Sequence, residues 1–309
     1  MRKQTIAPTR VTTTIPHTLS EDLAHAGLMA ERFFPPYIRR VGQAINLVHK
    51  VNPTAGCKLN MKALSVAIRR KLRPADLAFY RSGKRQLHKC GQHRFYTYTF
   101  GKGPAVLLIH GWCSDGSRWA AYVQELNRMG FQSVVIDAPS HGQSPGRLLS
   151  VPGYIACIEQ VMATRKHWHS VITHSMGSLT GVIAASHVFK ITKIDRFVLM
   201  STFADCDALM SKFSRCLGIS EHVLTDTRAW IKHYAGKPLE YFALKKHLHE
   251  MKTPPTLLIA DTDDIVVPQR ETQRILKNLS YIEHYLTSGL GHNLWADQVT
   301  EKVLKFVEE

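Results

Sequence analysis

From about residue 93 onward, short apolar runs alternate along the chain with longer amphipathic stretches. An aromatic, Thr-containing run at 95–100 has the texture of a strand. Five later runs have the length of buried strands: AVLLIH (105–110), SVVID (133–137), SVITH (170–174), FVLMS (197–201) and TLLIA (256–260). Near-continuous apolar strands separated by helices are typical of a parallel sheet covered on both faces. The pattern therefore predicts an α/β fold.

The gap between the last two runs is too long for a plain crossover helix. It spans about 54 residues and contains the helical patterns ALMSKFSRCLG and TRAWIKHYAG. We interpret it as a small helical insertion over about 203–252. Ligands of such sheets bind at the carboxyl ends of the strands. We therefore expect the insertion to cover the ligand site, with Trp230 and Tyr234 among the residues that line it.

The part of the chain before residue 93 has a broken helical pattern. We expect helices over 21–34 and 37–51, the first of them capped by Ser20. A third helix is expected over 61–72 (MKALSVAIRRKL) and should end at Pro74, since proline interrupts a helix.

The positive charge of the chain is concentrated in the same part. Of a formal net charge of +16, residues 1–100 carry +14, from 18 Lys and Arg against 4 Asp and Glu. We therefore divide the chain into a basic, mostly helical N-terminal extension (1–92) and an α/β domain (93–309). This uneven distribution of charge indicates that the N-terminal extension contacts an anionic surface or partner. The alternative is a basic face that is only solvated. The stretch 67–85 suits a membrane surface, whereas its sparse aromatic residues disfavour nucleic acid.

The cysteines and the apolar content indicate a cytoplasmic protein. The six cysteines include no C-x-x-C pair and no metal-ligand spacing, which is typical of free thiols in a reducing compartment. The chain has no apolar run of the length of a membrane-spanning helix, and no signal-peptide core follows its basic start.

The segment ITHSMGS (172–178) places Ser175 between a predicted strand and a predicted helix. A sharp turn there would hold the hydroxyl at the carboxyl edge of the sheet, close to a helix N-terminus that favours negative charge. Gly177 meets the need for small residues around such a turn. The simpler interpretation is a serine that only caps the helix.

A nucleophilic serine needs a base, and the base needs an acid that orients it. In a strand–turn–helix setting the expected chain order is serine, acid, histidine. The acid should follow a later strand, where DTDDIVVP offers Asp261, Asp263 and Asp264. We favour Asp264, because x-x-V-P follows it, and keep Asp263 as the alternative.

The base should follow the last strand. The segment SGLGHNLW (288–295) places His292 between a glycine-rich turn and a final helical stretch. His174 adjoins Ser175, but neighbouring residues of a strand point to opposite faces of the sheet. We therefore expect His174 to pack and His292 to act as the base.

Acyl transfer also requires hydrogen-bond donors directed at the oxyanion. The backbone N–H groups of Trp112, in the turn after the first apolar run, and of Met176 are the candidates. A third loop, DAPSHGQSPG (137–146), follows the strand SVVID. Its polar residues are expected to shape the loop rather than react: Asp137, His141 and Ser144.

Together these segments resemble the α/β-hydrolase fold family, in its serine-hydrolase branch with an HSMG nucleophile elbow. The motifs are HGW, DAPSHGQS, HSMGS, DDIVVP and GLGHNLW, and the match covers roughly 93–309. The resemblance implies a mostly parallel sheet with helices on both faces and a small helical cap. It also implies a Ser175–Asp264–His292 triad and an oxyanion hole at Trp112 and Met176. The sequence departs from the family pattern at three glycine positions: Thr173, Ser178 and Asp261.

The expected activity is that of a serine hydrolase. It would cleave a carboxylic ester, thioester or lactone of a small-molecule acyl substrate through an acyl-enzyme, without a metal or organic cofactor. The pocket is expected to be apolar, with Leu290 and Leu294 also lining it. The alternatives are other chemistry on the same fold, either C–C bond hydrolysis or cofactor-free peroxidation, and a non-enzymatic protein that docks to an anionic partner. The oligomeric state is left open.

Overall fold

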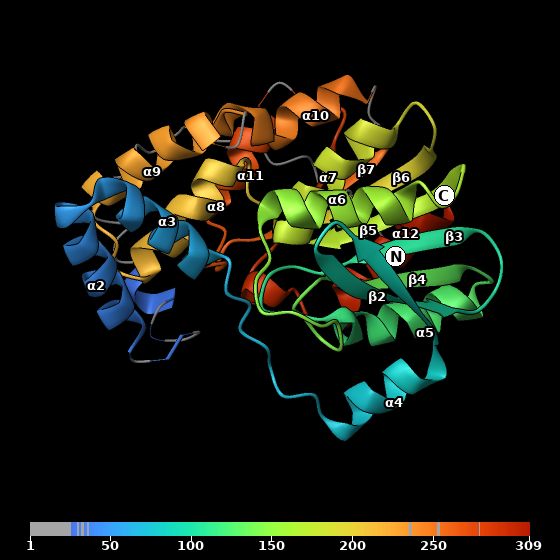
Figure 1. Cartoon of the computed structure of the whole chain (residues 1–309). Coiled ribbons are helices and arrows are strands. Elements are labelled where there is room, and N and C mark those ends of the chain that lie inside the picture. The colour runs from blue at the N-terminus through green and yellow to red at the C-terminus, as the bar shows by residue number, and fades with distance from the viewer. Residues whose placement is uncertain are drawn as a thin grey trace.

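The structure is a computed structural model that describes residues 26–29, 31, 34–35, 37–234, 237–251, 254–277 and 279–309. These residues form one eight-stranded sheet in the order β1-β2-β4-β3-β5-β6-β7-β8 (Figure 1). β1 pairs antiparallel with β2 and β2 with β4, whereas every later pair is parallel. The strands are β1 (Lys84–Cys90), β2 (His93–Phe100), β3 (Ala105–Ile109), β4 (Gln132–Asp137), β5 (His167–His174), β6 (Lys193–Met200), β7 (Thr256–Asp261) and β8 (Glu283–Thr287).

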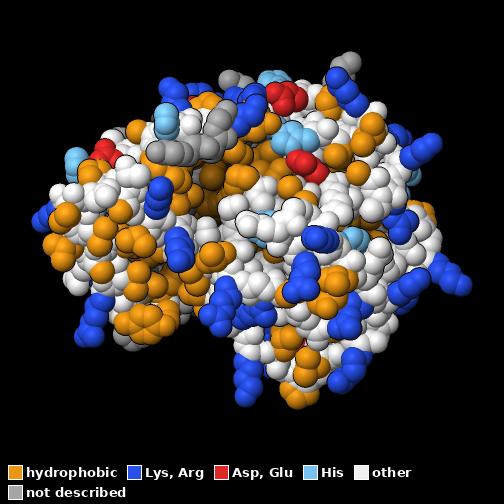
Figure 2. All heavy atoms as spheres, in the orientation of Figure 1, with side chains coloured by type: hydrophobic (Ala, Val, Ile, Leu, Met, Phe, Trp, Pro, Cys, Tyr) orange, Lys and Arg blue, Asp and Glu red, His pale blue; other side chains and the backbone are white. Residues whose placement is uncertain are grey.

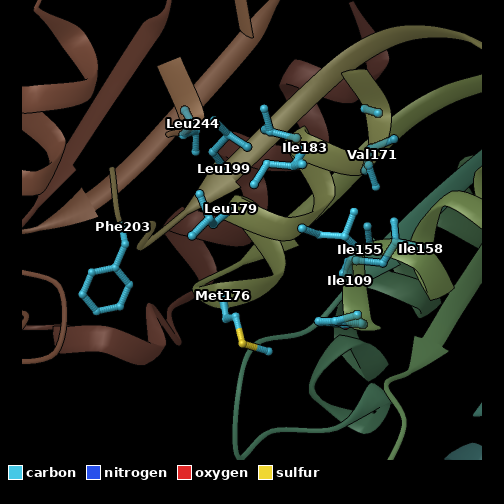
Figure 3. Close-up of a cluster of buried hydrophobic side chains, with 14 of the residues drawn as sticks. Ile109, Ile155, Ile158, Val171, Met176, Leu179, Ile183, Leu199, Phe203 and Leu244 are labelled. Atoms are coloured by element: carbon cyan, nitrogen blue, oxygen red, sulfur yellow. The ribbon is translucent and has the colours of Figure 1, made fainter. Parts of the chain in front are cut away.

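Helices cover both faces of this sheet, as the sequence pattern predicted. Alternate residues of β3 enter two separate hydrophobic clusters, with Leu107 and Ile109 on one face and Val106 and Leu108 on the other. The first cluster, part of which Figure 3 shows, also contains side chains of α6 (Val151–Met162), α7 (Met176–Val188), α10 (Leu244–Glu250) and α11 (Gln269–Leu276). The second contains side chains of α5 (Ala120–Arg128) and α12 (Asp297–Glu308).

The segment between β6 and β7 and the N-terminal part of the chain pack together as one helical layer (Figure 1). Ile45 of α2 contacts Val223 in one small apolar cluster, and Met61 of α3 packs on Leu224 in another. A Cβ on Gly42 would collide with the backbone of Leu217, so α2 approaches α8 closely. The elements concerned are α2 (Ile38–Val51), α3 (Pro53–Leu64), α8 (Cys206–Cys216), α9 (Glu221–Tyr234) and the short helix η2 (Leu239–Phe242). No helix among the described residues is both long and apolar enough to cross a membrane.

The helix expected over 61–72 is wrong beyond Leu64, where α3 ends. Val66 forms a bridge with Leu148, and the N–H of Ala67 donates to the carbonyl of Arg147. These contacts with the loop after β4 replace the hydrogen bonds of a helix. The chain then runs without helix or strand to Pro74, the first residue of α4 (Pro74–Ser82).

The hydrophobic pattern did not predict the two edge strands, β1 and β8. β1 lies in the stretch assigned to the N-terminal extension, and most of its residues are exposed. β8 is exposed at three of its five positions. An edge strand with solvent on both faces needs no run of apolar side chains, so its sequence carries little signal. Of the helix expected over 21–34, only 26–29 and 31 are described as helical, and the other residues lie mostly outside the described part.

Candidate active site

Ser175 lies in the sharp turn between β5 and α7. Its backbone has φ of 56° and ψ of −126°, a conformation that costs a residue other than glycine ~1–3 kcal/mol. Two glycines make room for the turn. A Cβ on Gly111 would lie 2.7 Å from Cβ of Ser175, and one on Gly177 would lie 2.5 Å from the carbonyl oxygen of His110. The turn places the serine at the carboxyl end of a central strand and at the N-terminus of a helix.

Thr173 occupies the position where the family pattern has glycine, and the neighbouring structure accommodates it. Its hydroxyl donates to the carbonyl of Val198 (2.7 Å) and lies 2.8 Å from the hydroxyl of Ser178. The residue that faces its methyl group is Gly181, where an added Cβ would lie 3.2 Å from Cγ2 of Thr173. Gly181 of the helix therefore provides the space that Thr173 of the strand occupies.

His292 connects Ser175 to Asp264 through its two ring nitrogens. Nε2 lies 3.0 Å from Oγ of Ser175, and Nδ1 lies 2.8 Å from Oδ2 of Asp264. The other carboxylate oxygen of Asp264 accepts the backbone N–H groups of Val266 (2.8 Å) and Val267 (2.9 Å). These two bonds hold the buried carboxylate in the orientation that meets the imidazole. Residues far apart in the sequence thus form one hydrogen-bonded chain.

The other two aspartates of the loop after β7 hold the segment that carries His292. Asp263 accepts the N–H of Gly289 (2.7 Å) on Oδ2. Asp261 accepts the N–H of Leu290 (3.1 Å) and that of Gly291 (3.0 Å) on its two oxygens. These bonds explain why an aspartate at position 261 fits where glycine is usual. Neither Asp261 nor Asp263 contacts the imidazole of His292, which meets Asp264 instead.

The two predicted oxyanion donors lie on either side of the serine. Met176 is the first residue of α7, so its N–H has no partner within the helix. Trp112 lies in the loop after β3, and no acceptor within the described part of the chain takes up its N–H. The next residue, Cys113, has φ of 54° and donates its N–H to Nε2 of His141 (3.2 Å). His141 therefore shapes the loop, which is the structural role expected for it.

His174 is buried behind Ser175 and contacts the segment of the base. Its Nε2 lies 2.8 Å from the carbonyl oxygen of His292, and its Nδ1 lies 2.9 Å from the guanidinium of Arg118. Arg118 also donates to the carbonyl of Asn293 (3.2 Å). The expectation that His174 packs rather than acts as the base agrees with this geometry. No motif indicated Arg118, because an isolated arginine in a helical stretch carries no signal.

The buried histidines around the site are held in the neutral form by desolvation. Burial lowers the pKa of His110 to about 3 and that of His141 to about 4. Burial and the neighbouring Arg118 hold the pKa of His174 well below its ordinary value. A neutral His174 that accepts from Arg118 on Nδ1 must carry its proton on Nε2 and donate it to the carbonyl of His292.

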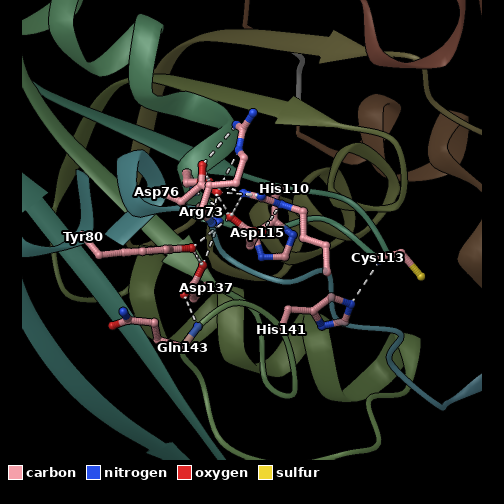
Figure 4. Close-up of polar contacts among 12 residues, drawn as sticks. Arg73, Asp76, Tyr80, His110, Cys113, Asp115, Asp137, His141 and Gln143 are labelled. Atoms are coloured by element: carbon pink, nitrogen blue, oxygen red, sulfur yellow. Dashed lines mark hydrogen bonds and ion pairs between the residues drawn. The ribbon is translucent and has the colours of Figure 1, made fainter. Parts of the chain in front are cut away.

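Asp137 lies in a polar network with Tyr80 and Gln143 (Figure 4). Its carboxylate accepts the N–H groups of Gly116 (2.7 Å) and Gln143 (2.8 Å), and the hydroxyl of Tyr80 lies 2.8 Å away. Burial raises the pKa of Asp137 to about 7. Ser144 donates to the carbonyl of Asp137 (2.8 Å). Asp137 and Ser144 therefore contact the backbone around the site and do not contact Ser175.

Two cavities meet at Trp112. The smaller, of about 190 Å³, is lined almost entirely by apolar residues, among them Met176, Leu209 and Trp230. The larger, of about 810 Å³, is lined by Ser175 and His292. Figure 2 shows a hollow with hydrophobic side chains inside it between the helical layer and the sheet.

Four residues expected in the apolar pocket have different outcomes. Trp230 lines the smaller cavity. Leu290 and Leu294 instead pack into the hydrophobic cluster beneath α5 and α12, so their assignment to the pocket is wrong. The side chain of Tyr234 lies outside the described residues.

Comparison with known proteins points to one fold family. The family model for the α/β-hydrolase fold matches residues 104–249. A pimeloyl-acyl-carrier protein methyl ester esterase of Methylococcus capsulatus is 33% identical over 88 residues, which are 28% of this chain and 33% of the relative. A human serine hydrolase-like protein is 26% identical over 50% of this chain and 76% of its own length. The solved esterase Pf2001 of Pyrococcus furiosus superposes with a TM-score of 0.56 at 19% identity, over 79% of this chain and 97% of that one.

The sheet and the family match define the class of fold, which is the α/β-hydrolase fold. The sheet order, the crossover helices and the matched region agree on this fold. The chain thus has the α/β-hydrolase fold, as its motifs predicted. It spans only about a third of the length of the Methylococcus relative.

Proposed function

We propose that the protein is a serine hydrolase that cleaves a carboxylic ester, thioester or lactone of a small-molecule acyl substrate. The observation that carries the proposal is the hydrogen-bonded chain from Ser175 through His292 to Asp264. A serine, a histidine and a carboxylate in this order constitute the arrangement that activates a hydroxyl for attack on an acyl carbon. The Methylococcus relative is named a methyl ester esterase, which agrees with this chemistry.

In the first half of the reaction, Oγ of Ser175 attacks the acyl carbon while Nε2 of His292 takes up its proton. Asp264 stabilises the imidazolium through the hydrogen bond to Nδ1. The N–H groups of Met176 and Trp112 stabilise the oxyanion of the tetrahedral intermediate. His292 then gives its proton to the leaving alcohol or thiol, and an acyl-enzyme remains.

In the second half, water takes the place of the leaving group. His292 accepts a proton from the water, whose oxygen attacks the acyl carbon and forms a second tetrahedral intermediate. Collapse of this intermediate releases the carboxylic acid, and His292 returns the proton to Oγ of Ser175. Apart from the substrate and this water, the reacting groups in these steps are Ser175, His292 and Asp264. We place this chemistry in the cytoplasm, in keeping with the six free cysteines.

A fluorophosphonate probe tests the proposal, because it labels only an activated serine. We expect covalent labelling of the wild-type protein at Ser175 and no labelling of a folded Ser175→Ala variant. Equal labelling of the two proteins, or none of the wild type, would contradict the proposal. Absence of label on the wild-type protein would favour the non-enzymatic alternative. Hydrolysis of a C–C bond, as in a β-diketone, without hydrolysis of any ester would instead favour the other chemistry on this fold.

A further inference from the structure

The basic segment between α3 and α4 lies at the candidate active site. Arg69, Arg70 and Arg73 line the same cavity as Ser175 and His292. Arg118, which follows β3 in the chain, lines the same cavity. Among the described residues that line this cavity, Asp76 is the one that carries a carboxylate. Four arginines against one aspartate leave the lining with an excess of positive charge.

Two of the four arginines lack a carboxylate partner. Arg69 donates to the carbonyl groups of Ser140 (2.8 Å), Ser144 and Gly146 (3.0 Å). Arg118 contacts the ring of His174 and a backbone carbonyl. No carboxylate within the described ranges forms an ion pair with either guanidinium. Carbonyl and imidazole acceptors orient a guanidinium but do not neutralise its charge.

The other two arginines share their acidic partners. Arg70 forms ion pairs with Asp76 (2.7 Å) and Asp115 (2.6 Å), and Arg73 also contacts Asp76 (3.3 Å).

Burial lowers the pKa of Arg118 to about 10, so this guanidinium remains protonated at neutral pH. The cavity therefore presents fixed cations that an anionic ligand would compensate.

The position of His292 decides which part of a substrate meets these cations. During acylation the imidazole must pass a proton from Oγ of Ser175 to the leaving atom, so the leaving group lies on the side of His292. His292 and Asn293 line the basic cavity, whereas Met176, whose N–H is directed at the oxyanion, lines the apolar one. The acyl chain thus fits the apolar cavity and the leaving group fits the basic cavity.

We propose that the substrate is an apolar acyl ester or thioester whose leaving alcohol or thiol carries a phosphate group, which Arg69 and Arg118 recognise. The proposal rests on the proposed function and names its substrate class. Phosphate matches the site because its oxygens can accept from several guanidinium groups at once. The predicted anionic partner of the basic N-terminal segment is then the substrate itself. The phosphate could belong to a coenzyme-like thiol or to a glycerol phosphate.

The decisive measurement compares kcat/KM for substrates that differ only in the leaving group. Hexanoyl-coenzyme A is paired with hexanoyl-N-acetylcysteamine, and hexanoyl glycerol 3-phosphate with monohexanoylglycerol. We expect the phosphate-bearing member of at least one pair to be favoured by about tenfold or more. The pair that shows the preference identifies the source of the phosphate. A monohexanoyl ester of glyceric acid tests a carboxylate in the same place, and an equal preference for it would overturn phosphate recognition.

Salt and variants test the assigned residues. The preference should shrink between 50 and 500 mM NaCl, because salt screens the attraction of the arginines for the phosphate. Arg69→Gln should reduce the preference ratio about tenfold. Arg128→Gln, an equal loss of charge on the exposed surface of α5, should leave the ratio as in the wild type. Inhibition of the wild type by free coenzyme A, with none by N-acetylcysteamine, would support the thiol form without any variant.

Failure of this proposal can be distinguished from failure of the proposed function. If the fluorophosphonate labels Ser175 but both members of each pair react at equal rates, the phosphate proposal is wrong and the serine hydrolase stands. If Ser175 takes no label, the proposed function itself fails. A ratio that falls equally in Arg69→Gln and Arg128→Gln would contradict the role assigned to Arg69.

Discussion

His174 donates a hydrogen bond from Nε2 to the backbone carbonyl of His292, across 2.8 Å. The residue next to Ser175 in the sequence therefore holds the segment that carries the base for Ser175. The two imidazole rings lie 4.9 Å apart between centroids. Movement of β5 relative to the loop after β8 would break this hydrogen bond together with the contact between Ser175 and His292.

Replacement of His174 tests its action through His292. We expect His174→Ala to lower kcat by about 10- to 100-fold with a smaller change in KM, because a misplaced base affects the chemical step more than binding. His174→Gln, which retains an N–H donor, should recover part of the rate. Steady-state kinetics on a short ester measure both effects. A loss of stability with an unchanged kcat in His174→Ala would indicate a packing role only.

The geometry distinguishes between the two candidate acids. Asp264→Asn should reduce the rate of fluorophosphonate labelling about 10³- to 10⁴-fold, because the carboxylate no longer stabilises the imidazolium. Asp263→Asn should reduce it about tenfold at most, since Asp263 contacts the loop of His292 and not its ring. The second-order labelling rates of the two variants provide the measurement. The reverse order would assign the acid to Asp263.

Thr173 and Gly181 should be coupled in stability. Gly181→Ala alone should destabilise the protein by ~1–3 kcal/mol, because the new Cβ would lie 3.2 Å from Cγ2 of Thr173 and 3.3 Å from Cδ1 of Ile109. In a Thr173→Gly background the same change should cost less, since the tight contact with the methyl group of Thr173 is absent and the one with Ile109 remains. Urea unfolding of the four proteins of this cycle measures the coupling. Additive effects would show that the two sites are independent.

The free energy of unfolding should fall as the pH drops from 7 to 5. His110, His141 and His174 are neutral and buried in the folded protein, with pKa values below the ~6.5 of an unfolded chain. Below that pH the unfolded chain binds protons that the folded protein excludes, and each group then costs ~1.4 kcal/mol per pH unit. Asp137 acts in the opposite direction, because burial raises its pKa and the folded protein binds its proton more tightly.

For these four groups the net loss approaches ~3 kcal/mol per pH unit near pH 5. Five further histidines whose pKa values burial lowers add to it: His88, His93, His169, His247 and His284. Urea midpoints measured at half-unit intervals of pH give this slope. His174→Gln should reduce it, because one of the buried histidines is gone. A flat profile between pH 7 and 5 would contradict the assignment of neutral buried imidazoles.

The apolar cavity should determine acyl-chain preference. Met210 is buried and lines this cavity from α8. Met210→Trp should fill part of the roughly 190 Å³ and lower kcat/KM for hexanoyl esters by about tenfold or more relative to acetyl esters. The same variant provides its own control, since an acetyl group needs little of the space. Equal losses for both chain lengths would place the acyl group elsewhere.

The sequence by itself determined the central strands, the order of the chemical motifs and the class of fold. Buried strands such as β3 and β7 consist mainly of apolar residues because both faces of the sheet are covered, and these apolar runs reveal them in the sequence. The positions of Ser175 after β5 and of Asp264 in the loop after β7 follow from the same pattern, because parallel strands end at one edge of the sheet. His292 follows β8, a strand that the pattern did not reveal, and was found from the glycine-rich turn around it.

Only the tertiary structure decided which side chains meet at that edge. The sequence alone does not distinguish among the three aspartates after β7. Asp264 is the one that contacts His292, because the backbone N–H of Val266 holds its carboxylate in that orientation. Arg69 and Arg118 lie 49 positions apart in the chain, and folding places both beside Ser175. Such contacts depend on how distant segments pack, and local propensity and periodicity contain no information about that packing.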